Sequence, residues 1–180
     1  MEEVETIKKS IRESVEQEAD LSKKEKAAII SSLEKIVVEG VLPFKAMGFS
    51  DNMMKFIYGQ AYRLYDGGHY AKAGDVFYLL NELNPADPRY LSGTAACHMK
   101  LEEWEKAIVD FMVLEKLEPD SPYHPYYLGG LYRKIGKFNA SYISYALAKK
   151  LCGENPELSV LKERALLNMQ ALEREGVLAA

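Results

Sequence analysis

The sequence contains few cysteines, no long apolar run and no excess of basic residues, and each shortage excludes a class of protein. Only Cys97 and Cys152 occur in 180 residues, which excludes a disulfide scaffold and favours a reducing compartment. We expect both to be buried as small apolar residues. No apolar run approaches the ~18 residues that span a bilayer, so no membrane insertion is expected. Residues 1–20 also lack the apolar core of a secretory signal.

The charge of the chain is acidic and concentrated at one end. The net charge is −4, and residues 1–20 alone, with seven acidic and three basic residues, sum to −4. The remaining body is therefore near neutral and carries no basic stripe. Nucleic acid is a poor candidate partner, because its binding depends on neutralising phosphates.

The most informative pattern is a repeat with a period of 34 residues. Identical residues recur at this spacing in four pairs: Pro85 and Pro119, Ala73 and Ala107, Phe77 and Phe111, Leu80 and Leu114. A third, looser copy continues the series through Tyr70, Trp104 and Phe138. A period of 34 is that of the tetratricopeptide repeat (TPR), a pair of helices that stacks into an array. The expected fold is therefore all-α.

Turn and helix-capping residues divide the chain into an N-terminal leader (residues 1–52), three repeats and a C-terminal capping helix. The repeats are predicted at about 54–87, 88–121 and 122–155, within a body of 53–155, with helices over about 70–83 and 104–117. Residues 21–52 are predicted to hold a helix, starting with the capping box Ser22–Glu25, and then a turn at Leu42–Pro43. Residues 156–180 are predicted to form a capping helix and tail, which closes the exposed end of an array.

Residues 1–20 leave two interpretations open. Val4, Ile7, Ile11 and Val15 step by three and four, which is a narrow apolar stripe on a helix. The rest of the segment is charged. It is either a helix that docks on another element or a flexible tail.

The resemblance to TPR proteins depends on a pattern of residue size. Small residues recur where the two helices of a repeat cross: Ala61, Ala95 and Gly129 on the first helix, Ala73 and Ala107 on the second. A larger side chain at such a crossing would force the helices apart, which costs about 1–3 kcal/mol. Repeat 3 departs from the pattern, because Ser141 replaces the alanine of the second helix and Gly153 replaces the proline. The sequence therefore does not fix the exact register of the third repeat.

The TPR resemblance implies a concave groove lined by the first helix of each repeat. Transferred position by position, the groove residues are Lys55, Tyr58, Tyr62, Tyr65, Arg89, Ser92, Ala96, Met99, Tyr123, Tyr126 and Arg133. Tyrosine offers apolar area and a hydroxyl at low entropic cost, and the small residues would leave hollows between the rings. Such a surface suits an extended, apolar, proline-containing peptide. The alternative is that some of these rings pack between helices.

The same positions argue against one common TPR function. Co-chaperones that bind acidic chaperone C-termini use a lysine, asparagine and arginine clamp. The corresponding positions here hold Tyr58 and Tyr62 in repeat 1, and Tyr123 and Tyr127 in repeat 3. A carboxylate clamp is missing.

A second resemblance is carried by the stretches YGQAYRLYDGG (58–68) followed by HYAKAGDVF, then DPRYLSGTAAC (87–97) and WEKAI (104–108). Through them the chain, over about residues 21–170, resembles the class II chaperones of bacterial type III secretion systems. The resemblance implies a protein of the bacterial cytoplasm that binds an N-terminal segment of hydrophobic translocator proteins in its groove. That binding keeps the translocators soluble and competent for export.

The resemblance further implies a homodimer formed through the N-terminal helices. The apolar residues of that helix are Ile29, Leu33, Ile36 and Val37. They form either a dimer contact or a cover for the end of repeat 1.

We find no pattern that indicates catalysis or a cofactor. His69, His98 and His124 lack metal-ligand spacing, and Gly67–Gly68 is a turn between helices rather than a phosphate loop. We therefore expect no enzyme, no catalytic residue, no metal and no cofactor. The rival function is a generic TPR scaffold between cytoplasmic proteins, and a helical hydrolase is a distant third.

Overall fold

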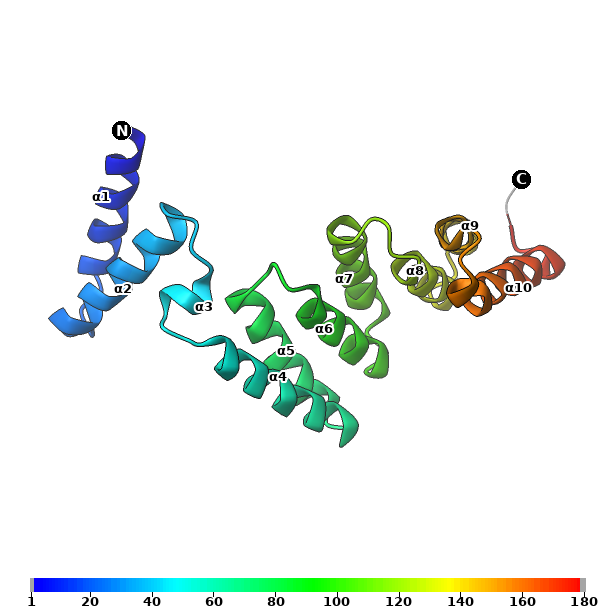
Figure 1. Ribbon diagram of the computed structural model, residues 1–180, viewed down its shortest axis with the longest axis horizontal. Coiled ribbons are helices and arrows are strands. Elements are labelled where there is room, and N and C mark those ends of the chain that lie inside the picture. Colours follow the sequence, from blue (N-terminus) through cyan, green and yellow to red (C-terminus); the bar gives the residue numbers. More distant parts are fainter. Residues whose placement is uncertain (1, 179–180) are drawn as a thin grey trace.

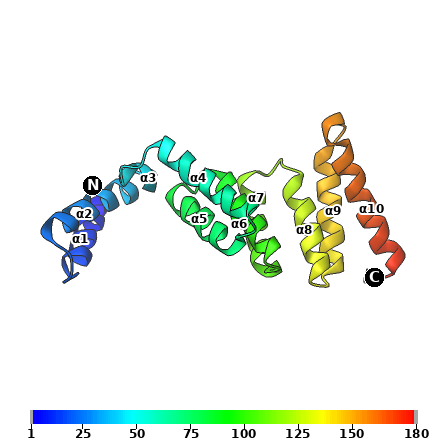
Figure 2. The ribbon, with the colours of Figure 1, turned by 90° about the horizontal axis from the view of Figure 1, so that it is seen from below.

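The computed structural model describes residues 2–178, and these residues form helices joined by turns, with no strand among them. Consecutive helices lie side by side along one long axis, with the N-terminus at one end and the C-terminus at the other (Figures 1 and 2). The helices are α1 (Glu2–Glu16), α2 (Lys23–Val37), α3 (Pro43–Ala46), α4 (Asp51–Asp66), α5 (Tyr70–Leu83), α6 (Pro88–Lys100), α7 (Trp104–Leu117), α8 (Tyr123–Lys134), α9 (Phe138–Cys152) and α10 (Ser159–Glu175).

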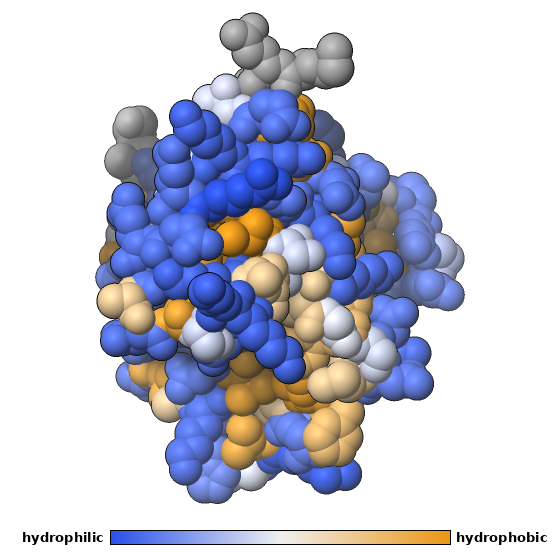
Figure 3. Space-filling view, turned by 90° about the vertical axis from the view of Figure 1, so that its left-hand side faces the viewer, coloured by the Kyte–Doolittle hydropathy of each residue, from blue (hydrophilic) through white to orange (hydrophobic). Residues whose placement is uncertain are grey.

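The N-terminal part of the chain is a pair of helices, α1 and α2. Of the two interpretations of residues 1–20, the structure agrees with the helix that docks on another element. Helix α1 packs along α2. Arg12 forms an ion pair with Glu34 at 2.9 Å, and Lys26 Nζ donates to the main-chain oxygen of Glu16 at 2.7 Å. Val15 is buried in this contact region. Viewed from this end, the molecule shows hydrophilic side chains above and a gathering of hydrophobic ones below (Figure 3).

The start of α2 has the predicted capping box. The Ser22 hydroxyl accepts a hydrogen bond from the backbone N–H of Glu25, and the Glu25 carboxylate accepts one from the backbone N–H of Ser22 at 2.8 Å. The Ser22 hydroxyl also lies 2.6 Å from the Glu25 carboxylate and can donate to it, and this contact, followed by the bond from the Ser22 N–H, holds the pKa of Glu25 below its ordinary value. The box satisfies two of the backbone donors that a helix N-terminus leaves free.

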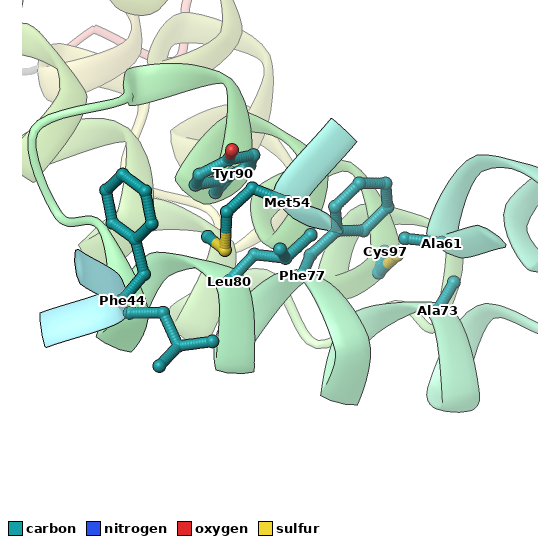
Figure 4. Packing of buried hydrophobic residues seen from close by; sticks show 9 residues of the cluster. Phe44, Met54, Ala61, Ala73, Phe77, Leu80, Tyr90 and Cys97 are labelled. Carbon is teal, nitrogen blue, oxygen red and sulfur yellow. The ribbon is translucent and has the colours of Figure 1, made fainter. Parts of the chain in front are cut away.

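The segment after α2 differs from the prediction, because the expected turn at Leu42–Pro43 contains the short helix α3. Phe44 of α3 is only 3% exposed and joins the core of repeat 1. It lies at one end of this cluster, with Ala61 near the other (Figure 4). Helix α3, through Phe44, therefore covers the open end of repeat 1.

The array consists of the helix pairs α4–α5, α6–α7 and α8–α9, each packed on the next. The predicted crossing residues Ala61, Ala73, Ala95 and Ala107 have no exposed surface. In repeat 3 the Ser141 hydroxyl donates to the main-chain oxygen of Gly129 at 2.6 Å. The hydroxyl thus bonds across the same crossing at which the other repeats place an alanine.

The C-terminal helix closes the array. Asn155 accepts a hydrogen bond from the N–H of Glu157, a single 3₁₀ turn covers Pro156–Leu158, and α10 follows. Helix α10 packs on α9 and buries Ala165, Met169 and Leu172.

Both cysteines are free and buried, as predicted. Burial raises the pKa of the Cys97 thiol to about 11, so the reactive thiolate is scarce at neutral pH.

Candidate functional site

A hollow of about 580 Å³ opens among the helices of repeats 2 and 3. Helix α6 lines it with Ser92, Ala96 and Met99, which share one side of the helix because they are spaced by four and three residues. Tyr65 of α4 and Tyr123 of α8 line it as well. These five are all predicted groove residues. The other lining residues are Lys100, Trp104, Phe111, His124, Tyr127 and Lys134.

A second hollow of about 190 Å³ continues the first toward repeat 1. Tyr62, Phe77 and Gly93 line it. The two hollows have three lining residues in common, namely Tyr65, Ser92 and Ala96. Together they form one groove, which we call the groove below, with small side chains on the α6 floor and aromatic rings on its walls.

Tyr58 is part of the wall rather than of the lining. Its ring centroid lies 5.0 Å from that of Tyr62, 5.8 Å from that of Phe77 and 5.5 Å from that of Tyr90, all in edge contacts. Tyr58 is half-buried, and this burial raises the pKa of its hydroxyl. The interpretation that some rings pack between helices therefore applies to Tyr58.

Arg89 and Lys55 also lie outside the two hollows. The Arg89 guanidinium stands 5.5 Å from the Tyr58 ring centroid, and its Nε donates to Asp87 at 2.8 Å. Asp87 also caps α6 by accepting from the Arg89 N–H. The hydrogen bonds from Arg89 hold the pKa of Asp87 below its ordinary value. Lys55 is exposed on α4.

Tyr126 and Arg133, the last two predicted residues, connect α8 to the helices that follow it. The Tyr126 ring makes edge contacts with Tyr145 of α9 at 5.6 Å and with Tyr127 at 6.0 Å. Arg133 forms an ion pair with Glu175 near the end of α10. Neither side chain lines the hollows.

Sequence reasoning missed the rings that the second helices bring to the groove. Phe111, which the 34-residue period marks only as a repeated residue, lines the large hollow and stacks on Tyr127 with centroids 5.0 Å apart. Trp104 lines the same hollow. The sequence contains one signal of this difference, because Tyr127 stands 34 residues after Gly93 and so occupies the equivalent position in the next repeat. Replacement of glycine by tyrosine at equivalent positions indicates that the wall of the groove differs between the two repeats.

Gly93 lets the Phe77 ring approach the floor of the small hollow. A Cβ atom on Gly93 would lie 2.5 Å from Cδ1 of Phe77, far inside van der Waals contact. Glycine is therefore required on α6 for close packing of this ring, rather than for an unusual backbone angle.

Two lysines at the ends of the first helices bring positive charge to the large hollow. Lys100 Nζ lies 5.9 Å from the ring centroid of Tyr70, and Lys134 Nζ lies 5.5 Å from that of Trp104. The Lys134–Trp104 pair stands 34 residues after the Lys100–Tyr70 pair. Both ammonium groups are held over aromatic faces and line the hollow.

Two of the histidines have structural partners. His98 Nδ1 lies 2.6 Å from Asp110, which joins α6 to α7, and His124 Nε2 lies 2.8 Å from Glu118 at the end of α7. Burial raises the pKa of Asp110, and the bond to His98 opposes that effect. Over residues 2–178, no three His, Cys, Asp or Glu side chains are grouped so as to hold a metal ion. In the same range, no helix is long and apolar enough to cross a bilayer.

Comparisons with known sequences and structures give a consistent result for the fold. No protein-family model matches the sequence, and no curated protein matches it. Among solved structures, a type III secretion complex from Aeromonas hydrophila matches with a TM-score of 0.74 at 19% identity, over 82% of this chain and 99% of that one. The Yersinia enterocolitica translocator chaperone SycD, in complex with a peptide of the translocator YopD, matches with a TM-score of 0.67 at 23% identity, over 71% and 97%.

A third structure agrees with these two. PcrH from Pseudomonas aeruginosa, in complex with the chaperone-binding region of PopD, matches with a TM-score of 0.67 at 22% identity, over 72% of this chain and 97% of that one. All three neighbours are matched over nearly their whole length. The chain therefore has the all-helical TPR fold of the type III secretion translocator chaperones.

Proposed function

We propose that this protein is a type III secretion chaperone of the bacterial cytoplasm, not an enzyme. It binds an extended N-terminal segment of hydrophobic translocator proteins in the groove and keeps them soluble and competent for export. The observation that carries the proposal is the continuous groove, with the small residues Ser92, Gly93 and Ala96 between aromatic walls.

The dimensions of the groove suit an extended peptide. The two hollows that form it are lined by residues of α4, α6 and α8, and an extended chain, which advances about 3.3 Å per residue, can cross these helices in turn. The small floor residues leave room for its side chains, and the exposed parts of Tyr62, Tyr123 and Tyr127 cover them.

The neighbouring structures support this occupant. SycD and PcrH are described in complexes with a peptide of YopD and with the chaperone-binding region of PopD. A groove that covers an apolar segment of the client in this way would remove an exposed patch through which the client otherwise self-associates. Because a short peptide becomes ordered on binding, we expect modest affinity and easy release.

The decisive test uses overlapping 12-residue peptides from the N-terminal regions of the translocators encoded in the same genome, with binding measured by fluorescence anisotropy. Ala96→Glu places a long carboxylate on the groove floor and should weaken the tightest peptide at least 30-fold. Ala71→Glu is the matched control, because Ala71 is exposed on α5 and lines neither hollow of the groove. Circular dichroism should show that both variants remain folded.

Two results would contradict the proposal. Equal affinity of a folded Ala96→Glu variant and the wild-type protein would remove the groove as the binding site. Binding of folded cytoplasmic proteins but of no translocator peptide would favour the generic TPR scaffold instead.

The proposal includes a homodimer through α2. Ile29, Leu33 and Ile36 are half-buried, whereas Val37 at the end of α2 is 55% exposed. Val37→Glu should therefore shift the protein toward monomer in sedimentation velocity, while Lys116→Glu, on the exposed surface of α7, should leave the dimer intact. A wild-type protein that sediments as a monomer would contradict this part of the proposal.

A further inference from the structure

The 34-residue period does not stop at the third repeat. Pro88, Pro122 and Pro156 stand at equal intervals of 34 and open the segments that lead into α6, α8 and α10. In this register α10 is the first helix of a fourth repeat whose second helix is missing from the described residues. Its positions therefore correspond one by one to those of α6, 68 residues earlier.

Two faces of α10 are explained by its role as a cap. Ala165, Met169 and Leu172 are buried against the preceding helix. The face on which a further helix would pack carries exposed Ser159 and Glu163. A polar end face is what a capping helix needs, because nothing packs on it.

A third face of α10 is not explained by capping. Val160 and Leu167 are 57% and 55% exposed, and Arg164 is exposed between them. The three residues are spaced by four and three, so they share one side of the helix. In the register of α6 they correspond to Ser92, Ala96 and Met99, the residues that line the groove floor.

An ion pair shows which way this face points. Glu175 lies eleven residues, or about three turns, after Arg164 and so on the same side of α10. It pairs with Arg133 of α8, which occupies the position on α8 that Met99 occupies on α6. The exposed apolar face of α10 therefore opens toward the groove side of α8. Arg164 makes no ion pair with any residue in the range 2–178.

We infer that α10 is the last section of the groove and binds the continuation of the same extended peptide. The peptide carries an acidic residue opposite Arg164, with apolar residues beside it that contact Val160 and Leu167. This inference rests on the proposed function and lengthens its site by one helix.

The test lengthens the tightest 12-residue peptide of the array by four native residues at each end in turn. Extension at one end only, the end that lies over α8, should raise affinity about tenfold. Arg164→Glu should remove that gain and leave the affinity of the short peptide unchanged, whereas Lys116→Glu, the same change of charge on α7, should keep the gain. Replacing the acidic residue of the extension by lysine should weaken binding to the wild type and restore it to Arg164→Glu.

The apolar part is tested by Val160→Ala combined with Leu167→Ala, which should also reduce the gain at least threefold. No gain from either extension, together with a strong effect of Ala96→Glu, would overturn the inference and leave the proposed function standing. Absence of any groove-binding peptide would overturn both. Self-association of the free protein that the Val160/Leu167 double variant abolishes would assign this face to a second copy of the chain instead.

Discussion

The two halves of the groove are built on the same repeat but differ in shape. Between repeats 1 and 2, the Phe77 ring lies against Gly93 of α6, and the hollow there measures about 190 Å³. Between repeats 2 and 3, the equivalent ring of Phe111 stacks on Tyr127, and the hollow measures about 580 Å³. The halves share their backbone plan and differ in which residue faces the ring.

This difference teaches how a repeat protein acquires a specific site. The crossing residues Ala61, Ala95 and Gly129 keep the helices at constant spacing. One variation that changes the groove lies on the inner side of the first helices, where Gly93 of α6 and Tyr127 of α8 occupy equivalent positions 34 residues apart. An array with one backbone plan thus presents a narrow section followed by a wide one.

The largest expected effect on stability comes from adding a side-chain atom at Gly93, where the Phe77 ring leaves no room for one. Gly93→Ala would place Cβ 2.5 Å from the Phe77 ring and should lower the free energy of unfolding by about 2 kcal/mol. Gly59→Ala is the matched control, because nothing lies within 4 Å of its Cβ position in α4. That variant should stabilise by about 0.5–1 kcal/mol. Urea unfolding followed by circular dichroism measures both, and equal stabilities would refute the contrast.

The stability of the wide half, between repeats 2 and 3, should depend on the ring of Tyr127. Tyr127→Ala removes the ring that stacks on Phe111 at 5.0 Å and should cost about 1.5 kcal/mol of unfolding free energy. Tyr78→Ala, at a site that is 58% exposed on α5, should cost less than about 0.5 kcal/mol. The prediction fails if both tyrosines cost the same in urea unfolding.

A smaller effect should separate repeat 3 from repeat 2 at the helix crossing. Ser141→Ala removes a buried hydroxyl that donates to the Gly129 main-chain oxygen and should cost about 1 kcal/mol. The reciprocal Ala107→Ser brings a hydroxyl near the main-chain oxygen of Ala95, 34 residues earlier, and should change stability by less than 1 kcal/mol, on the scale of one hydrogen bond. Thermal unfolding of the two variants decides whether serine acts here by its hydrogen bond or only by its size.

The smallest effect concerns the cap of α6. Asp87→Asn keeps the cap and loses the ion pair with the largely exposed Arg89, at a cost of about 0.5 kcal/mol at pH 7. Because Arg89 lowers the pKa of Asp87 in the folded state, this stability is present above about pH 4 and is lost as the pH falls through the lowered pKa. Urea unfolding at pH 7 and pH 2.5 measures the difference. A cost that persists at pH 2.5 would point to the cap rather than to the charge.

The repeat helices could be predicted from the sequence because their limits are set locally. Helices α5 and α7 begin and end at the predicted residues, since turns precede them and Pro85 and Pro119 follow them. Helix α3 could not be predicted, because its four residues form a helix where Phe44 docks into a core supplied by later repeats.

The groove was predictable where small residues leave space and unpredictable where large ones fill it. Ser92, Ala96 and Met99 line it as position alone suggested. Tyr126 holds the position of Ser92 but packs on Tyr145, and Arg133 pairs with Glu175, 42 residues away. The outcome at these sites depends on neighbours from other helices, which the position within a repeat does not specify.

The stacking of each helix on its immediate neighbours has a consequence for how the chain folds. The helices that share the most contacts follow one another in the sequence, so little loop-closure entropy opposes the search for the native state, and folding should be fast for 180 residues. Opening should begin at the two ends and proceed inward, helix by helix. Amide protons of α6 and α7 should then exchange with solvent last, and the middle of the groove would persist while the ends fray.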